Sequence, residues 1–399
     1  MCKSQEIGKD RKVLIAGAGI GGLTAAVALQ KLGFSVEVYE AAPVLKPTGA
    51  GIVLAPNALE VLRLLGLKEN IQSAGHRLTH GMKVTDKNRN PIQELSGYDE
   101  KGMFGHSSTT IHRGALQQAL LNVVGEDNVY TGKRCQKVEQ TDDTVTLTCE
   151  DGTRATGHLL LGADGIHSAV RKQLFPNISL RYSGETCWRG ISNFASGEKW
   201  SGRGFEMWGS SGRFGLMPIS DTQVYWFSTQ KVGPGGKDKS QEAAKAALVE
   251  KFAHYAEPVP MVLEGTPADK ILRHDLFDFA PISNWSKGSI GLIGDAAHAT
   301  TPNMGQGGCQ AIEDAWGLYL CLQREQDLAK ALKDFQALRF PKASMVVKNS
   351  YLFGKLAQMK NPVLCWFRNA MLRMTPTSVI LKQLKQLYLV PSQLPAKRI

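Results

Sequence analysis

Glycines and carboxylates stand at the ends of apolar stretches in three places along the chain, where they can bind a ligand. The first is GAGIGG at residues 17–22, which follows an apolar stretch and precedes a helix-like segment. Gly17, Gly19 and Gly22 allow a tight turn and let backbone N–H groups approach a pyrophosphate at the helix N-terminus. Glu40 ends the next expected strand, where a carboxylate can accept hydrogen bonds from both ribose hydroxyls. This arrangement predicts a dinucleotide site.

The second place distinguishes between the common dinucleotides. Asp295 follows an apolar strand, and Pro302, Gly305, Gly307 and Gly308 come before the next helix-like segment. A carboxylate near a polyol and backbone amides near a reducible ring suit FAD better than NAD. The alternative is a strand-to-helix loop that binds no ligand, and it leaves this concentration of glycine and proline unexplained. The sequence therefore predicts FAD as the cofactor.

Two further charged residues occupy comparable positions. Asp164 lies in LLLGADG, which repeats the order of strand, glycine, acid and helix start. Arg113 lies at an expected helix start, where it can pair with phosphate, although a surface cation is the commoner role for a lone arginine. The seven cysteines include no C-x-x-C pair, so no metal site is expected.

Together the three motifs resemble the single-component (group A) FAD-dependent aromatic monooxygenases, which have the para-hydroxybenzoate hydroxylase fold. The resemblance covers residues 13–320 and rests on GxGxxG with Glu40, the Asp164 stretch and GDAAH…P…GQG…EDA. It implies that the adenosine and pyrophosphate end of FAD contacts Gly17, Gly19, Gly22, Glu40 and Arg113. It implies that Asp164 contacts both FAD and the pyridine nucleotide, and that Asp295 contacts the ribitol. The isoalloxazine is implied to lie beside Pro302, Gly305, Gly307 and Gly308.

The resemblance also implies a reaction. In that family NAD(P)H reduces the flavin, the reduced flavin reacts with O2, and a flavin C4a-hydroperoxide hydroxylates or epoxidises an aromatic or polycyclic small molecule. The chain has no second GxGxxG unit, which fits a nicotinamide co-substrate that binds transiently. Two alternatives stay open: a flavin-dependent reductase of an unsaturated lipid-like substrate, and a flavin-binding sensor without catalysis.

An aromatic-rich group of expected strands, residues 186–229, is the candidate substrate wall. About half of its side chains must face away from any pocket, because side chains alternate along a strand. Arg213 and Tyr225 lie in RFGLMPISDTQVYWF, which is similar to the FAD-dependent urate hydroxylases, where a matching Arg and Tyr contact the purine. Arg189 departs from that subgroup, which carries Asn there. Arg213 and Tyr225 are therefore the catalytic candidates, with a urate-type purine hydroxylase as an alternative.

The predicted fold class is α/β: a Rossmann-like FAD-binding domain interleaved with a β-sheet substrate domain, followed by C-terminal helices. Residues 138–149 are expected to form a single strand. The predicted boundaries are 1–78, 104–180 and 275–345 for the FAD-binding domain, 79–103 and 181–274 for the substrate domain, and 346–399 for the C-terminal helical segment.

Charge is unevenly distributed along the 399 residues. The net charge is +11, and residues 330–399 contain 13 Lys or Arg and one acid. Apolar residues at helical spacing in this basic segment predict helices packed on the FAD-binding domain, with weak peripheral contact to an anionic membrane as a second interpretation. No nucleic-acid-binding motif is present. The scattered cysteines and polar N-terminus predict a cytoplasmic protein. The resemblance and the aromatic-rich strands imply that it acts on an aromatic or apolar small molecule and O2.

Overall fold

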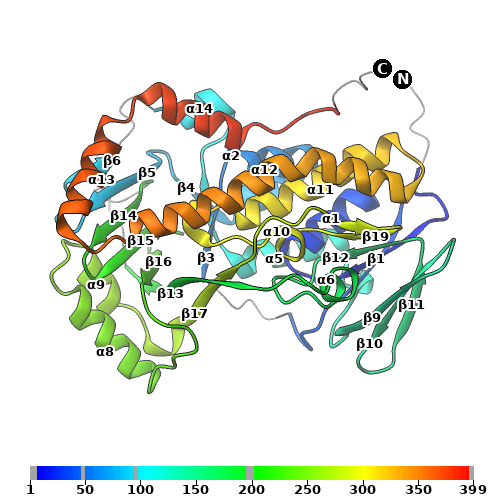
Figure 1. Cartoon of the computed structure of the whole chain (residues 1–399), viewed down its shortest axis with the longest axis horizontal. Coiled ribbons are helices and arrows are strands. Elements are labelled where there is room, and N and C mark those ends of the chain that lie inside the picture. The colour runs from blue at the N-terminus through cyan, green and yellow to red at the C-terminus, as the bar shows by residue number, and fades with distance from the viewer. Residues whose placement is uncertain (1–6, 46–49, 94–97, 195–201, 395–399) are drawn as a thin grey trace.

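Alternating apolar strands and helices build a six-stranded, mostly parallel sheet in the computed structural model (Figure 1). The structure describes residues 7–45, 50–93, 98–194 and 202–394. In spatial order the strands are β18 (Ser286–Lys287), β19 (Ile290–Leu292), β12 (Leu159–Gly162), β1 (Lys12–Ala16), β2 (Ser35–Tyr39) and β8 (Val129–Tyr130). Only β18 runs antiparallel to its neighbour. The carboxyl ends of β1, β2, β12 and β19 therefore meet at one edge.

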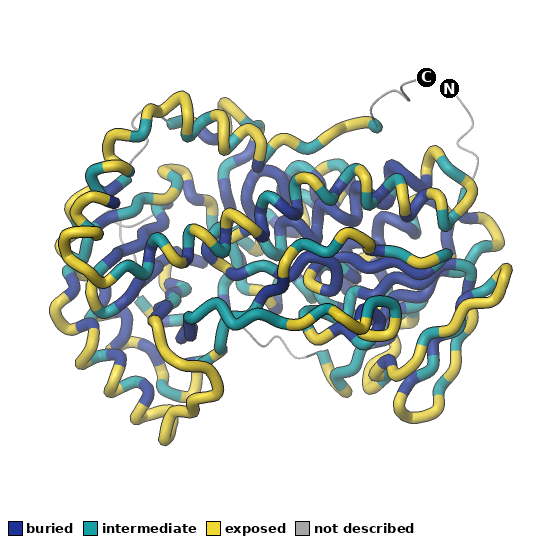
Figure 2. Tube along the Cα trace, in the orientation of Figure 1, coloured by how far each residue is buried: buried dark blue, intermediate teal, exposed yellow. Residues whose placement is uncertain are grey.

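Helices surround this sheet, and the central one is apolar on nearly every side. Nine of the eleven residues of α1 are buried, because α1 packs between the sheet and two other helices, α5 and α11 (Figures 1 and 2). The helices of this region are α1 (Ile20–Gln30), α2 (Pro56–Leu64), α3 (Lys68–Gln72), α5 (Arg113–Val124), α6 (Ala169–Leu174), α10 (Asp295–His298), α11 (Gly307–Arg324) and α12 (Leu328–Ala357).

A second, seven-stranded sheet is largely antiparallel. Its strands are β17 (Leu272–Asp278), β13 (Arg181–Asn193), β16 (Gln223–Gln230), β15 (Gly212–Pro218), β14 (Gly204–Gly209), β5 (Met82–Asp86) and β6 (Pro91–Gln93). One face packs with α8 (Gln241–Phe252) and α9 (Val259–Glu264) around Phe214, Trp226 and Phe252. The sheet joins β5 and β6 to strands more than one hundred residues later in the chain. Chain segments of the two sheets are thus interleaved, although the predicted domain boundaries stay a prediction.

Two small sheets and three further helices complete the fold. Two three-stranded sheets consist of β3 (Gly51–Leu54), β7 (Thr109–His112) and β4 (Gly75–Arg77), and of β11 (Arg154–Gly157), β10 (Val145–Cys149) and β9 (Cys135–Gln140). The single strand expected over 138–149 is wrong, because a turn at residues 141–144 separates β9 from β10. The helices α4 (Glu100–Phe104), α13 (Pro362–Met374) and α14 (Thr377–Tyr388) lie outside the sheets, and α13 contacts β6.

The predicted α/β fold class, with its parallel FAD-type sheet, second sheet and C-terminal helices, is confirmed. The short helical turns are η1 (Glu126–Asn128), η2 (Ala268–Lys270) and η3 (Pro302–Met304). No helix in the described ranges combines the length and the hydropathy that crossing a bilayer requires.

Candidate functional site

The glycine turn after β1 shows two different uses of glycine. Gly17 has φ +107, and a Cβ there would lie 2.5 Å from the Ala163 carbonyl oxygen. A Cβ at Gly22 would lie 2.0 Å from the Gly17 oxygen, so any side chain at either position would force the turn apart. A Cβ at Gly19, the N-cap of α1, would meet nothing within 4 Å. Gly17 and Gly22 allow the turn to pack, whereas Gly19 leaves space in front of the α1 amides, where an anion binds favourably.

Glu40 closes this turn from the end of β2. One carboxylate oxygen accepts a hydrogen bond from the Ala18 amide at 2.8 Å, and the other accepts one from the Ala42 amide at 2.8 Å. A carboxylate oxygen has two lone pairs, so each retains a further acceptor position. Glu40 can therefore order the turn and accept from ribose hydroxyls at the same time.

Asp295 begins α10 immediately after β19 and Gly294. Asp295 is exposed to solvent, although the residues on either side of it in the chain are buried. Desolvation raises the pKa of Asp295, although His298, Arg113 and Arg171 partly offset the effect. Among the described residues, none donates a hydrogen bond to this carboxylate. Its lone pairs are therefore available to a polyol such as the ribitol.

Asp164 occupies the equivalent position after β12. One of its oxygens caps α6 by accepting from the Ala169 amide at 2.7 Å and the Val170 amide at 3.2 Å. The other oxygen, Oδ1, is buried and has no partner within the described chain. Arg171 of α6 is buried and donates to the Ala296 carbonyl of α10 at 3.1 Å. This arginine, which sequence reasoning did not single out, connects the Asp164 and Asp295 motifs.

The loop after α10 brings together the other residues that were predicted to flank the isoalloxazine. Pro302 begins η3, and Gly305 follows it in the left-handed region with φ +63. Gly307 and Gly308 are the first residues of α11. A Cβ at Gly308 would lie 2.7 Å from the terminal methyl of Ile52 in β3, so a larger residue would displace the end of that side chain.

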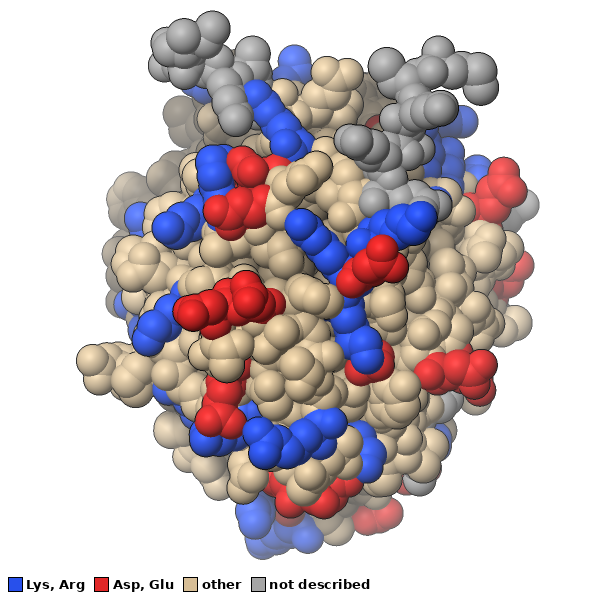
Figure 3. Space-filling model, turned by 90° about the vertical axis from the view of Figure 1, so that its right-hand side faces the viewer, with Lys and Arg blue, Asp and Glu red and all other residues tan. Residues whose placement is uncertain are grey.

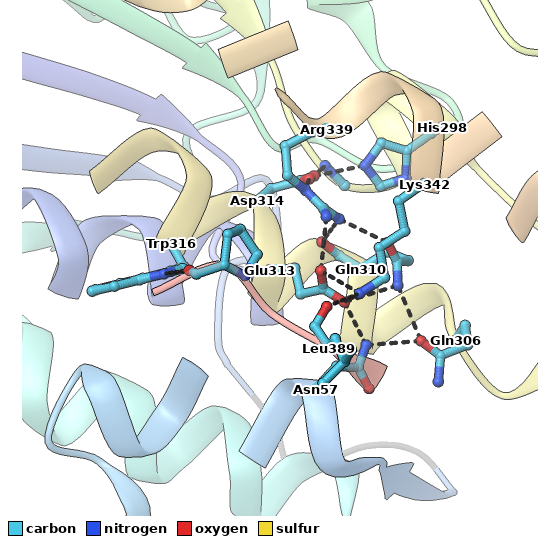
Figure 4. A network of polar contacts seen from close by, with 12 residues as sticks. Asn57, His298, Gln306, Gln310, Glu313, Asp314, Trp316, Arg339, Lys342 and Leu389 are labelled. Carbon is cyan, nitrogen blue, oxygen red and sulfur yellow. Dashed lines mark hydrogen bonds and ion pairs between the residues drawn. The ribbon is translucent and has the colours of Figure 1, made fainter. Parts of the chain in front are cut away.

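A buried network of charged side chains holds α11 against α12 (Figure 4). Arg339 of α12 donates to Asp314 at 2.9 Å, to Glu313 at 2.8 Å and to the Gln310 side chain at 2.7 Å. His298 Nε2 lies 2.6 Å from the second oxygen of Asp314. Burial alone would raise the pKa of Asp314, but His298 and Arg339 outweigh it and lower the pKa.

The same network extends from α11 to the loop ends. Asp314 accepts a hydrogen bond at 2.8 Å from the amide of Gly294, the residue before Asp295. Asn57 of α2 donates to Gln306, the residue before α11, at 3.0 Å (Figure 4). Both ends of the loop between β19 and α11 are thereby anchored to buried side chains, which orients Asp295 and the glycines without direct contact.

The aromatic wall divides between the two faces of the seven-stranded sheet, as strand alternation requires. Its members in the core under α8 and α9 are Trp188, Phe205, Met207, Phe214 and Trp226. By the same alternation, the opposite face carries Arg189, Trp208, Arg213, Met217, Tyr225 and Phe227. Only the second set can face a ligand held by the six-stranded sheet.

Tyr225 lies where this second face meets β3. A Cβ at Gly51 would lie 2.6 Å from Tyr225 Cβ, so β3 sits directly against the tyrosine. Ile52, the next residue of β3, is the one that packs against Gly308. Desolvation raises the pKa of Tyr225, with Arg189 partly offsetting it, so the phenol is neutral and can donate a hydrogen bond near pH 7.

Arg213 is held by internal partners. It is 1% exposed, its Nε donates to Glu206 at 2.6 Å, and its NH1 donates to the Asn303 side chain. Glu185 lies 3.9 Å away. Arg213 therefore ties the seven-stranded sheet to Asn303, which directly follows Pro302. Its predicted contact with substrate stays a prediction.

Arg113 lies at the first position of α5, and its amide donates to the Ala50 carbonyl at 3.1 Å. Its side chain is exposed, and its charge acts on Asp295, Tyr225 and His274. The arginine therefore lies between the two sheets, near the groups that were predicted to contact the cofactor and the substrate.

Two residues near Tyr225 complete a polar corner that the sequence did not identify. Arg189 of β13 has a buried Nε with no partner in the described chain, and its NH2 lies 3.4 Å from Nδ1 of His274 in β17. Burial and the charge of Arg189 lower the pKa of His274. In the sequence, the CWRG stretch pointed to Arg189. Nothing in the sequence pointed to His274, because β17 pairs with β13 from 85 residues away.

Comparisons with known proteins agree with this geometry. A family model described as "FAD binding domain" matches residues 10–350. The aurachin C monooxygenase/isomerase of Stigmatella aurantiaca is 40% identical, over 91% of this chain and 94% of the relative. The 2-heptyl-3-hydroxy-4(1H)-quinolone synthase of Pseudomonas aeruginosa is 32% identical, over 92% of this chain and 94% of the relative. The structure of Klebsiella pneumoniae HpxO with FAD and uric acid has a TM-score of 0.88 at 30% identity, and the match covers 96% of this chain and 97% of that structure.

Proposed function

The chain belongs to the FAD binding domain family, and from this premise we propose that it hydroxylates a planar fused heteroaromatic ring that carries an apolar chain. The predicted family, the predicted monooxygenase class and the predicted FAD cofactor are confirmed. The substrate class, the NAD(P)H co-substrate and the individual residue roles are proposals.

We propose that the loops at the carboxyl edge of the six-stranded sheet hold FAD. The α1 amides beside Gly19 bind the pyrophosphate, Glu40 binds the ribose, and Asp295 binds the ribitol. Arg113 and Asp164 lie at the same edge, and residues 302–308 lie beside the ring. When bound, FAD supplies the redox and oxygen-transfer chemistry, while the protein orients the substrate and excludes water.

The observation that carries the substrate proposal is the polar corner of Tyr225 and Arg189, on the sheet face that also carries Met217 and Phe227. The phenol and the unpartnered Nε–H of Arg189 are donors, and they suit a ring oxygen such as a quinolone carbonyl. Met217 and Phe227, on the same face, suit an apolar chain. The name of the relative from Pseudomonas aeruginosa describes such a compound, an alkylated and hydroxylated quinolone.

The net reaction that we propose places one oxygen atom of O2 on a ring carbon of the quinolone and releases the other as water. NAD(P)H supplies the two electrons. A 2-alkyl-4(1H)-quinolone should accelerate NAD(P)H oxidation by the FAD-loaded protein in air. Mass spectrometry should show a product heavier by one oxygen, and heavier by a further two mass units under 18O2. Oxidation without 18O incorporation would indicate the reductase or uncoupling instead.

A urate-type purine hydroxylase is the second candidate, favoured by the fold shared with HpxO bound to uric acid. One observation weighs against it, because Arg213 is engaged by Glu206 and Asn303. The resemblance described above also implies Asn in the urate enzymes where this chain has Arg189. Uric acid in the same assay separates the two candidates, because only one of the compounds should both accelerate NAD(P)H oxidation and gain oxygen.

We expect Tyr225→Phe to lower kcat/KM about tenfold while leaving FAD content and stability unchanged. The variant loses one hydrogen-bond donor to the substrate but keeps the ring that packs on β3. Steady-state kinetics and the flavin-to-protein absorbance ratio measure the two effects separately. Tyr130→Phe, at an exposed position in β8, is the matched control. Parallel loss of FAD and activity in Tyr225→Phe would assign the hydroxyl to the cofactor site.

We also propose a cytoplasmic location and peripheral contact with a membrane through residues 346–399. The six described cysteines are all free thiols, which suits a reducing compartment. A substrate with an apolar chain partitions into membranes, so contact through the basic C-terminal segment would bring the enzyme to it.

A further inference from the structure

One side of α13 exposes a continuous apolar stripe. Val363, Phe367, Met371 and Met374 follow the spacing i, i+4, i+8 and i+11, which places them along one line of a helix. Together with Leu364 and Trp366, they expose between 53% and 80% of their surfaces (Figure 2). A monomeric soluble protein rarely leaves such a patch uncovered.

The opposite side of α13 is firmly packed, so the orientation of the stripe is fixed. Arg368 is buried, donates to the carbonyls of Leu356 and Ala357 at 3.2 and 3.1 Å, and lies 4.7 Å over the Trp208 ring. Leu372 packs in the same small core as Trp208. Rotating the helix to bury the stripe would break these contacts.

The chain segment that carries the stripe has charge of one sign. Residues 351–399 contain eight Lys or Arg and no Asp or Glu. By contrast, the face shown in Figure 3, at the other end of the molecule from α13, mixes basic and acidic side chains. A segment that is both apolar and basic suits an anionic partner with an apolar interior.

A basic recess adjoins the start of α13. It encloses about 200 Å³, and its lining includes Lys231, Lys251 and Lys360 together with the hydroxyls of Ser210 and Ser211. Its remaining lining residues are Gly212, Gln230 and Gln358, so no acid balances the three ammonium groups. Desolvation and the charge of Lys360 lower the pKa of Lys251. Three ammonium groups and two hydroxyls are the donors that a phosphate group requires.

We propose that α13 and this recess dock the protein on an anionic phospholipid bilayer. The apolar stripe enters the boundary between headgroups and acyl chains, and the recess binds a headgroup phosphate. A second copy of the chain is a poorer occupant. A two-fold interface would place two basic segments against each other. The inference does not depend on which substrate the enzyme takes.

The full-length, FAD-loaded protein tests this by co-sedimentation with two kinds of vesicle, phosphatidylcholine alone and phosphatidylcholine mixed with phosphatidylglycerol. We expect binding to the anionic vesicles, at least tenfold weaker binding to the neutral ones, and weakening by salt. Equal binding to both vesicles, or binding to neither, would overturn the proposal.

Two sets of variants locate the contact. The stripe variant W366S/F367S/M371S and the recess variant K231Q/K251Q/K360Q should each lower anionic-vesicle binding at least tenfold. Their controls change exposed residues outside α13 and the recess: M82S/V123S/M261S for apolar area and K31Q/K172Q/K333Q for charge. Controls that lose as much binding as the test variants would show non-specific adsorption and overturn the assignment.

Three further readouts separate the competing explanations. Light scattering without vesicles that shows a dimer, lost in the stripe variant, would assign the stripe to self-association and overturn the bilayer proposal. Inorganic phosphate that stabilises the protein through the three lysines, without any vesicle binding, would make the recess a free-phosphate site and overturn it too. Turnover of a water-soluble substrate should be unchanged in both variants, which keeps this test independent of the proposed function.

Discussion

Asp295→Ala should weaken FAD binding by about tenfold to a hundredfold, the loss expected when a charged acceptor of a hydrogen bond is removed. In the folded protein the Asp295 carboxylate is crowded enough for its pKa to rise, yet it accepts no hydrogen bond from the described residues. Such an acceptor contributes little to the protein without cofactor and is available to a ribitol hydroxyl. Fluorescence titration of the apoprotein with FAD measures the change.

The matched control for this prediction is Asp334→Ala, which removes an exposed acid of α12 from a surface pair with Lys330. It should leave FAD affinity unchanged. An Asp295→Ala protein that still purifies with stoichiometric FAD and titrates like the parent would remove Asp295 from the cofactor site.

The same substitution has a pH signature in the apoprotein. Because the folded-state pKa of Asp295 is raised, the folded protein retains a proton that the unfolded chain releases at about pH 3.9. The stability of the parent therefore falls as pH rises through the window between the unfolded and folded pKa values. Relative to the parent, Asp295→Ala should gain most in Tm near neutral pH, and the gain should disappear in acid. A gain that does not vary with pH would have another cause.

Arg339→Leu should lower the free energy of unfolding by about 3 kcal/mol or more, the largest stability effect that we expect. Arg339 is 4% exposed and neutralises both Glu313 and Asp314, so its loss leaves two buried carboxylates short of a partner. Lys342 still pairs with Glu313 and His298 with Asp314, which keeps the effect near the lower end of the range for a broken buried pair. Urea unfolding of the apoprotein measures it.

Two controls accompany this prediction. Lys330→Leu breaks exposed pairs with Asp334 and Glu325 and should change stability only slightly. Arg339→Lys keeps the charge but cannot reproduce the forked contacts, so it should fall between the parent and Arg339→Leu. An effect of Arg339→Leu as small as that of Lys330→Leu would mean that the network in Figure 4 does not hold α11 to α12.

Local chemistry in the chain was sufficient to predict the unit of β1, α1 and β2 and its glycine turn. An apolar strand, three glycines, a helix and an acid occur within about thirty residues, and each element forms from neighbours in sequence. Asp164 and Asp295 could be predicted for the same reason, because both follow apolar strands of one parallel sheet whose carboxyl ends must meet. The turn between β9 and β10 was missed because residues 141–144 give only a weak turn signal between two strand-like stretches.

The surroundings of Arg213, Tyr225 and Asp295 depend on tertiary structure alone. Strand alternation predicts that half of the wall faces away, but only the pairing of the strands shows which half. Arg213 appeared free in the sequence, whereas its partners Glu206 and Asn303 come from β14 and from η3, 90 residues away. His274 reaches Arg189 through pairing of β17 with β13. The sequence by itself therefore determined the cofactor motifs, because they are contiguous, and the tertiary structure decided the substrate side, because its contacts join segments that are distant in the chain.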